Sequence, residues 1–133
     1  MVDVHGLKDR TGSLRLELYP DNKADFLADD TKLLAVGKTF RRVVAPTPAS
    51  GEVELCIRAP APGAYALMLV HNRAGETSFS ISKDGVGVPG NPPSLYGSPS
   101  LTQAHIDVGR GISHATIVMM YRRGLLSFGP TQS

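Results

Sequence analysis

The sequence contains a single cysteine and no tryptophan, which limits the functions it can be assigned. Cys56 is the only cysteine among 133 residues, so no internal disulfide can form. In the pattern Glu54-Leu55-Cys56-Ile57-Arg58 the thiol shares a strand face with two charged residues, and the neighbouring sequence supplies no general base. We therefore expect a packed or half-exposed thiol and not a nucleophile.

Long apolar runs and a strong net charge are also missing. The longest apolar run is far shorter than the roughly 18 residues of a membrane-spanning helix, so we expect no integral membrane segment. The opening Val2-Asp3-Val4-His5 is typical of a strand, so we expect no signal peptide in this sequence. The formal net charge of +2 is too small to favour nucleic acid as a partner.

Turn-forming residues are abundant by comparison. The 14 glycines and 10 prolines favour an all-β architecture with many turns. A chain of 133 residues fits one domain, which we assign to residues 1–133.

The longest apolar stretch, 61–71, predicts the central strand of the fold. Turn residues bracket it, and both faces of an extended chain would be apolar there. One face carries Tyr65, Leu67 and Leu69, and the other carries Ala66, Met68 and Val70. A strand that is apolar on both faces is covered on both sides.

Six further strands and one short helical segment follow from the pattern of the chain. The segments predicted as strands are 2–5, 13–19, 39–45, 52–58, 101–108 and 113–122. In 13–19 three leucines face the core, while Arg15 and Glu17 face water. One or two helical turns are expected within 23–35, capped by Asp21 or Asn22. Together these segments predict an antiparallel β-sandwich of about seven strands.

We expect no metal and no cofactor. The aspartates between residues 21 and 30 lack the offsets and the glycine of a calcium loop. His5, His105 and His114 do not have metal-ligand spacing. The glycine-rich stretch 84–90 is followed by prolines that forbid the helix of a phosphate-binding loop.

Several segments, in order, resemble one known family. They are Val4-His5-Gly6-Leu7-Lys8-Asp9-Arg10-Thr11-Gly12-Ser13-Leu14, then Pro60-Ala61-Pro62-Gly63-Ala64-Tyr65-Ala66 with its strand ending at His71, then Lys83-Asp84-Gly85-Val86-Gly87-Val88. The stretches Leu101–Ala104 and Thr116–Tyr121 resemble its closing strands. Over nearly the whole chain the sequence is similar to the bacterial Domain of Unknown Function 2141. The resemblance implies a small exported β-sandwich, immunoglobulin-like or prealbumin-like, with a periplasmic or extracellular location.

The resemblance also locates a difference from the family. Its members follow the strand-end histidine with an acidic loop, whereas this chain has His71-Asn72-Arg73-Ala74-Gly75-Glu76. One carboxylate beside an arginine offers too few oxygens for a hard cation, so we expect no specific calcium at this loop.

The connection 72–100 is the predicted recognition surface, since long loops in small domains commonly carry function. The candidate ligand-binding residues are His71, Glu76, Phe79, Asp84 and Tyr96. The leading hypothesis is a non-enzymatic binding or accessory module outside the cytoplasm, with a small molecule or a surface protein as its partner. A small enzyme that uses His71 with Asp84 or Glu76 is an alternative. A structural role, in which His71 hydrogen-bonds loop backbone, is the more common one for such a histidine. A structural subunit that assembles through strand edges, for example as a homodimer, is a further alternative.

Overall fold

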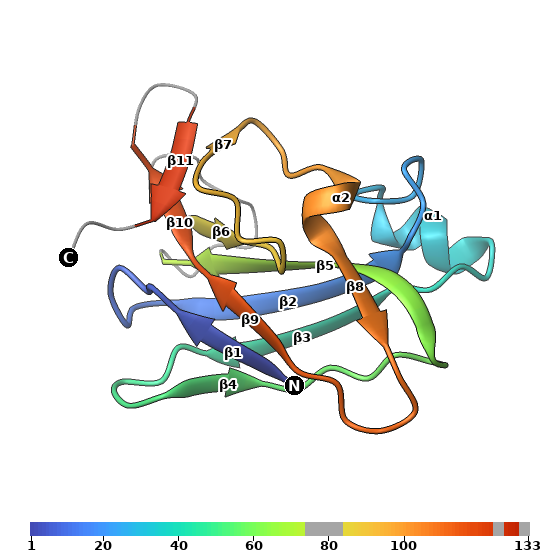
Figure 1. Cartoon of the computed structure of the whole chain (residues 1–133), viewed down its shortest axis with the longest axis horizontal. Helices are drawn as coiled ribbons and strands as arrows, with labels where there is room; N and C mark the ends of the chain where they lie inside the picture. The colour runs from blue at the N-terminus through green and yellow to red at the C-terminus, as the bar shows by residue number, and fades with distance from the viewer. Residues whose placement is uncertain (74–83, 124–126, 131–133) are drawn as a thin grey trace.

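The computed structural model describes residues 1–73, 84–123 and 127–130, and these form two β-sheets packed face to face (Figure 1). The described strands are β1 (Val2–His5), β2 (Ser13–Pro20), β3 (Arg41–Pro46), β4 (Val53–Leu55), β5 (Gly63–Asn72), β6 (Gly85–Gly87), β7 (Leu95–Tyr96), β8 (His105–Val108), β9 (Ala115–Val118), β10 (Met120–Arg122) and β11 (Ser127–Pro130). The described helices are α1 (Asp30–Ala35) and α2 (Leu101–Ala104). The all-β sandwich expected from the sequence is confirmed.

The smaller sheet, in the described part of the chain, has the strand order β4-β1-β9. β1 pairs antiparallel with β4, where Val2 lies opposite Leu55. On its other edge β1 pairs parallel with β9, where Val2 lies opposite Ala115. The first strand of the sequence is therefore held between two strands that come much later.

The larger sheet is organised around β5, as the apolar stretch predicts. β2 pairs with one edge of β5 along most of its length, with Leu16 opposite Leu69. On the other edge, β8 pairs with the beginning of β5 and β6 pairs with its end. The remaining order runs β3-β2-β5-β6-β10-β11-β7.

The main core lies between the two sheets. Its buried members, all apolar apart from the two tyrosine hydroxyls, are Val2, Val4, Leu14, Leu16, Leu18, Val53, Leu55, Tyr65, Leu67, Leu69, Ile117, Met119 and Tyr121. The chain passes from the smaller sheet to the larger one at the buried Met119, between β9 and β10. The segment predicted as a single strand over 113–122 is therefore two strands that belong to different sheets.

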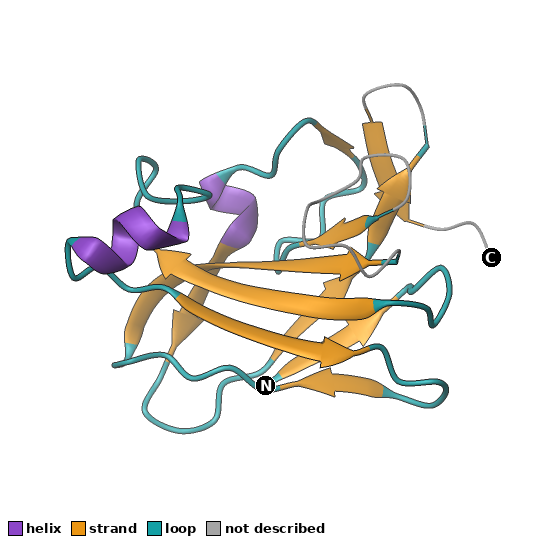
Figure 2. Cartoon of the chain, turned by 180° about the vertical axis from the view of Figure 1, so that it is seen from behind, coloured by secondary structure: helices purple, strands orange, loops and turns teal. Residues whose placement is uncertain are grey.

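The opposite face of β5 is covered by the helices and the 20–40 connection. Ala66 packs there with Tyr19, Leu33, Phe40 and Ala104. Seen from behind, α1 and α2 lie together at one end of the larger sheet (Figure 2). β5 is thus apolar on both faces because each face packs against a separate cluster.

Both helices differ from the segments expected at their positions. The sequence predicts a strand over 101–108, but its first half is α2, which begins at a capping box between Ser100 and Gln103. Within 23–35 the helix begins only at Asp30, after the N-cap Asp29, and neither Asp21 nor Asn22 caps it. Leu27 has a φ of 65°, so a helix cannot run through it.

Two expectations for strands are also corrected. Glu17 was expected to face water, but it is 4% exposed. Its carboxylate accepts a hydrogen bond from Arg42 Nε at 2.8 Å and another from the Tyr19 hydroxyl at 3.2 Å. The strand expected over 52–58 ends at Leu55, and the residues that follow leave the sheet.

Candidate functional site

The two ends of β5 are chemically different. Its C-terminal end carries His71 among polar side chains, and its N-terminal end borders an apolar hollow. We call the first group the His71 network, which consists of Asp9, Thr11, His71, Arg73 and Tyr121. We call the second region the end cavity.

His71 is fully buried, and both of its ring nitrogens are occupied. Nε2 lies 2.8 Å from the carbonyl oxygen of Thr11, and Nδ1 lies 2.7 Å from the hydroxyl of Tyr121. A carbonyl can only accept, so Nε2 must carry the proton and donate it. In the neutral ring, Nδ1 then accepts from the Tyr121 hydroxyl.

Tyr121 joins this histidine to the start of the chain. Its hydroxyl accepts a hydrogen bond from the backbone N–H of Lys8 at 3.1 Å. Burial raises the pKa of Tyr121 to about 12, so the hydroxyl keeps its proton at neutral pH. The ring lies against the backbone of Gly85, where a Cβ would be 2.5 Å from a ring carbon, so a side chain there would displace it.

Arg73 and Asp9 complete the His71 network. Arg73 Nε donates to Asp9 Oδ2 at 2.8 Å, and the backbone N–H of Thr11 donates to Asp9 Oδ1 at 3.1 Å. The hydrogen bond from Arg73 and those from Thr11 hold the pKa of Asp9 well below its usual range. Asp9 is 3.9 Å from Nε2 of His71, too far for a hydrogen bond.

The turn that brings Thr11 to His71 depends on Gly12. Its φ is +67°, and a Cβ there would lie 1.9 Å from the carbonyl oxygen of Asn72. Only glycine permits this contact between the β1–β2 turn and the end of β5.

The structure places three of the five residues proposed from the sequence. Asp84 is buried beside the His71 network and accepts a hydrogen bond from the backbone N–H of Arg73 at 2.9 Å. Tyr96, on β7, is 79% exposed and forms no part of that network. Glu76 and Phe79 lie outside the described residues.

The His71 network is a structural junction in the part of the chain that the structure describes. Its histidine has no ring nitrogen left for a substrate, and its carboxylate is held by an arginine. It joins the β1–β2 turn, the end of β5 and β10, which meet at this end of the sandwich. Pairing His71 with Tyr121 could not be read from the sequence, because the two residues are fifty positions apart.

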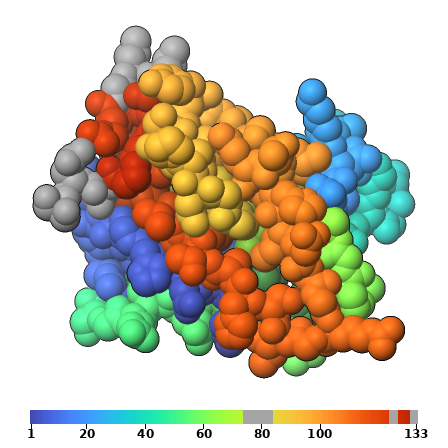
Figure 3. All heavy atoms as spheres, viewed as in Figure 1, coloured from blue at the N-terminus to red at the C-terminus, as the bar shows by residue number. Residues whose placement is uncertain are grey.

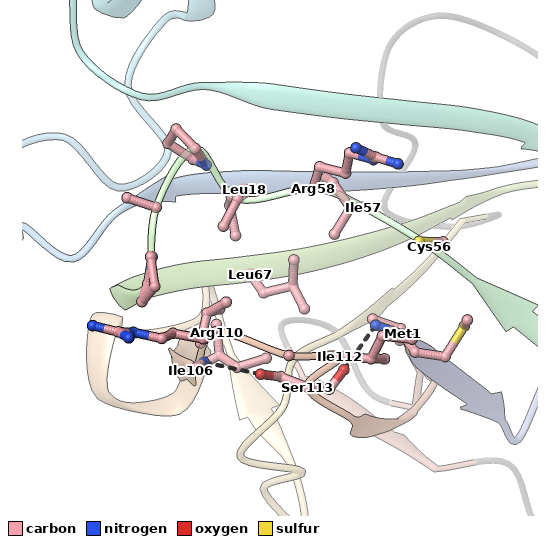
Figure 4. A pocket seen from close by; sticks show the side chains of 18 residues that line it. Met1, Leu18, Cys56, Ile57, Arg58, Leu67, Ile106, Arg110, Ile112 and Ser113 are labelled. Atoms are coloured by element: carbon pink, nitrogen blue, oxygen red, sulfur yellow. Dashed lines mark hydrogen bonds between the residues drawn. The ribbon is translucent and has the colours of Figure 1, made fainter.

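The end cavity has a volume of about 600 Å³ and opens at the other end of the sandwich (Figure 3). The buried side chains of Leu18 and Leu67 lie inside it (Figure 4). Its walls come from the start of β1, the segment after β4, β8 and the connection from β8 to β9. The apolar residues of the walls include Val2, Ile57, Ala59, Ile106, Val108 and Ile112.

The mouth of the end cavity carries two arginines. Arg58 and Arg110 lie on opposite sides of it, with their guanidinium groups directed outward (Figure 4). The exposed thiol of Cys56 lies on the same lining, as does Ile112, which is 75% exposed. The thiol that the sequence predicts to be packed or half-exposed is thus exposed, on a residue of this lining.

Sequence reasoning missed the end cavity. Strand alternation places Ile57 inward, but it does not indicate that the chain leaves the sheet after Leu55. The prolines Pro60 and Pro62 were the available signal, because a proline-rich segment cannot continue a sheet ladder.

Metal and membrane chemistry receive no support from the described residues. Among them, no group of three or more histidine, cysteine, aspartate or glutamate side chains is placed to hold a metal ion. No helix in the same residues is long and apolar enough to cross a membrane. The expected lack of calcium binding concerns residues 71–76, half of which lie outside the described residues, so it stays a prediction.

Comparison with known proteins identifies a family. No curated protein and no solved structure matches the chain. A bacterial family described as "Uncharacterized protein conserved in bacteria (DUF2141)" matches residues 2–116. This match covers both ends of β5, every residue of the His71 network except Tyr121, and nearly all of the end cavity. The chain therefore belongs to the DUF2141 family, as the order of its motifs indicates.

Proposed function

We propose that the protein is a non-enzymatic binding module that holds a small apolar molecule in the end cavity. The observation that carries this proposal is a partly open hollow of about 600 Å³ whose lining is mainly apolar and includes the buried core residues Leu18 and Leu67. Ligand sites are typically preformed, mostly apolar hollows of about 300–1,000 Å³. The size and lining of the end cavity fit that description.

The volume sets the size of the ligand. At about 30 Å³ for each water-sized group, the end cavity takes a ligand of roughly 10–20 non-hydrogen atoms. Burial of its apolar surface contributes about 25 cal/mol per Å², from which the loss of motional freedom is subtracted. A ligand of this size would bind in the micromolar range if its apolar part were buried in the end cavity.

The lining favours binding over catalysis. The ionisable side chains on it are Cys56, Arg58 and Arg110. Acid–base catalysis needs a group that exchanges a proton near neutral pH, and an arginine does not. The Cys56 thiol has no histidine, aspartate or glutamate among the described lining residues to act as its base. At the other end of β5, both ring nitrogens of His71 are already hydrogen-bonded, which does not favour the alternative of an enzyme that uses His71 as a base.

Cys56 provides a direct test. The neutral apolar probe N-phenylnaphthylamine should fluoresce on binding and should slow the alkylation of Cys56 by iodoacetamide. The control is the double variant Cys56→Ser/Ser50→Cys, which carries its thiol on the exposed turn before β4. Alkylation of that thiol should not respond to the probe. Equal protection of both thiols, or of neither, would refute a site in the end cavity.

The family resemblance supports a second part of this proposal, a location in the periplasm or outside the cell. Fractionation of a bacterium that expresses the protein from its own gene tests it. Recovery with the cytoplasmic fraction would contradict it.

Assembly through strand edges is the second candidate. β3 lies at the edge of the larger sheet, and its Val44 is 59% exposed. An exposed apolar residue on an edge strand favours pairing with a second copy. Size-exclusion chromatography over a range of concentrations measures this, and Val44→Lys should abolish any dimer that forms through this edge.

A further inference from the structure

We propose that the ligand of the end cavity is an amphipathic anion, a free aliphatic carboxylate whose chain lies on Leu18 and Leu67 and whose head group lies between Arg58 and Arg110. This inference rests on the proposed function, because it names the class of molecule that the same cavity would take.

The charge at the end cavity has one sign. Its lining carries two arginines and the Met1 ammonium, which donates to the carbonyl oxygen of Ser113 at 2.9 Å, and none of its described residues is an aspartate or a glutamate. The whole chain has 14 basic and 12 acidic residues, so a lining without any carboxylate is not a consequence of overall composition. A negative head group would meet attraction from both sides of the opening and no repulsion from its lining.

Neither arginine is engaged elsewhere in the described part of the protein. Arg42 is paired with Glu17 at 2.7 Å, and Arg73 is held by Asp9. Arg58 and Arg110, by contrast, have no hydrogen-bond or ion-pair partner among the described residues, and both are exposed. Each can turn toward a head group at the mouth without breaking an existing bond. A guanidinium group also matches the two oxygens of a carboxylate.

The apolar part of the lining continues from the interior to the mouth. Leu18 and Leu67 lie deepest, while Ile57 and Ile106 face each other across the space (Figure 4). Ile112 extends this surface outward, and at 75% exposure its side chain offers apolar area that a bound chain would remove from water. An aliphatic chain that enters past Ile112 would cover it and would leave its carboxylate level with the arginines.

The test compares ligands of equal length and different head groups. Decanoate, decanol and decylamine are titrated at neutral pH by displacement of N-phenylnaphthylamine, below the concentration at which each forms micelles. Decanoate should bind about threefold to tenfold more tightly than decanol, the range expected for a partly exposed charge pair. Decylamine should bind more weakly than decanol.

Three variants assign the effect to the arginines. In Arg58→Gln and Arg110→Gln the preference for decanoate over decanol should shrink, and in the double variant it should shrink further, to what the Met1 ammonium alone contributes. Lys32→Gln, which is exposed on α1 over the opposite face of the larger sheet and is not part of the lining, should leave the preference unchanged. Because Ile112 is exposed, Ile112→Glu should fold normally, and it should reverse the preference between decanoate and decylamine.

Salt and chain length separate the two parts of the ligand. Raising the ionic strength from about 0.05 M to 0.5 M should weaken decanoate binding and leave decanol binding unchanged, because only the charged contact is screened. Each added methylene from octanoate to dodecanoate should tighten binding by about fourfold while it is buried.

Failure of this inference is distinguishable from failure of the proposed function. Equal binding of decanoate and decanol would overturn the anionic head group and leave an apolar site in place. Absence of binding by all three ligands and by the probe would overturn both. Binding only to vesicles that contain phosphatidylglycerol, with no binding of free decanoate, would overturn the free carboxylate as the occupant.

Discussion

Replacing Tyr121 by phenylalanine removes one oxygen atom from the His71 network and nothing from the apolar core. The hydroxyl serves two partners, Nδ1 of His71 and the backbone N–H of Lys8. Because His71 is fully buried, water cannot replace the lost donor. A buried polar group left without its partner costs about 1–3 kcal/mol, and the lost Lys8 bond adds about 0.5–1.5 kcal/mol. We expect Tyr121→Phe to lower the free energy of unfolding by about 2–4 kcal/mol.

Tyr65→Phe is the matched control at the other end of the sandwich. Both tyrosines belong to the same apolar cluster, and both are buried: Tyr65 is 8% exposed and Tyr121 is 4% exposed. The hydroxyl of Tyr65 makes one hydrogen bond, to the carbonyl oxygen of the exposed Ala61 at 2.6 Å. Water can take over that carbonyl, so this variant should lose only about 0.5–1.5 kcal/mol.

Urea unfolding followed by far-ultraviolet circular dichroism measures both variants. Tyrosine fluorescence is unsuitable because each variant removes a fluorophore. The dependence of the unfolding free energy on urea should be the same in both, since neither changes the surface buried on folding. If Tyr121→Phe costs no more than Tyr65→Phe, the hydroxyl does not stabilise the buried histidine, and our reading of the His71 network as a structural junction fails.

Four further substitutions test other contacts by the same measurement. Gly12→Ala should cost at least about 3 kcal/mol, because its methyl would overlap a backbone carbonyl 1.9 Å away. Gly37→Ala, which also has a positive φ but no atom within 4 Å, should cost only about 1–2 kcal/mol. Glu17→Gln should cost about 1–3 kcal/mol because the buried carboxylate that pairs with Arg42 is lost, and a near-zero cost would mean that Glu17 faces water after all. Asp9→Asn should cost about 1–2 kcal/mol at neutral pH after screening is allowed for. The hydrogen bond from a guanidinium lowers the folded-state pKa of Asp9, so its contribution is present above the unfolded value of about 3.9 and is lost as the pH falls further. The stability curves of wild type and Asp9→Asn should therefore converge in acid, and a constant gap down to pH 2 would contradict the ion pair.

The strands could be predicted from the sequence wherever apolar residues alternate with polar ones, because one face of such a strand packs on the core. Leu14, Leu16 and Leu18 alternate on β2 and are all buried as expected. Glu17 was misjudged because alternation shows which face a residue occupies and not what covers that face. The start of α2 was readable from Ser100 and Gln103, since serine followed three residues later by glutamine is a capping box.

The sites depend on distances in space that the sequence does not contain. The end cavity is built from three segments, near residues 1, 60 and 110, that meet only in the folded chain. The sequence directed attention to the loop that follows His71, because long irregular loops often carry function. It could not indicate that the ring nitrogens of His71 would be hydrogen-bonded to Tyr121 and to the backbone of Thr11.

The parallel pairing of β1 with β9 has a consequence for the order of folding. Val2 lies opposite Ala115, so this ladder closes only after more than a hundred residues have been drawn together. Closing so long a loop costs entropy before any contact repays it, whereas β2 and β3 are near neighbours in sequence. The larger sheet should therefore form first, with β1 docking late between β4 and β9. Until it docks, Val2 and Val4 are an apolar strand without a partner, and this is the interval in which newly made chains are most exposed to aggregation.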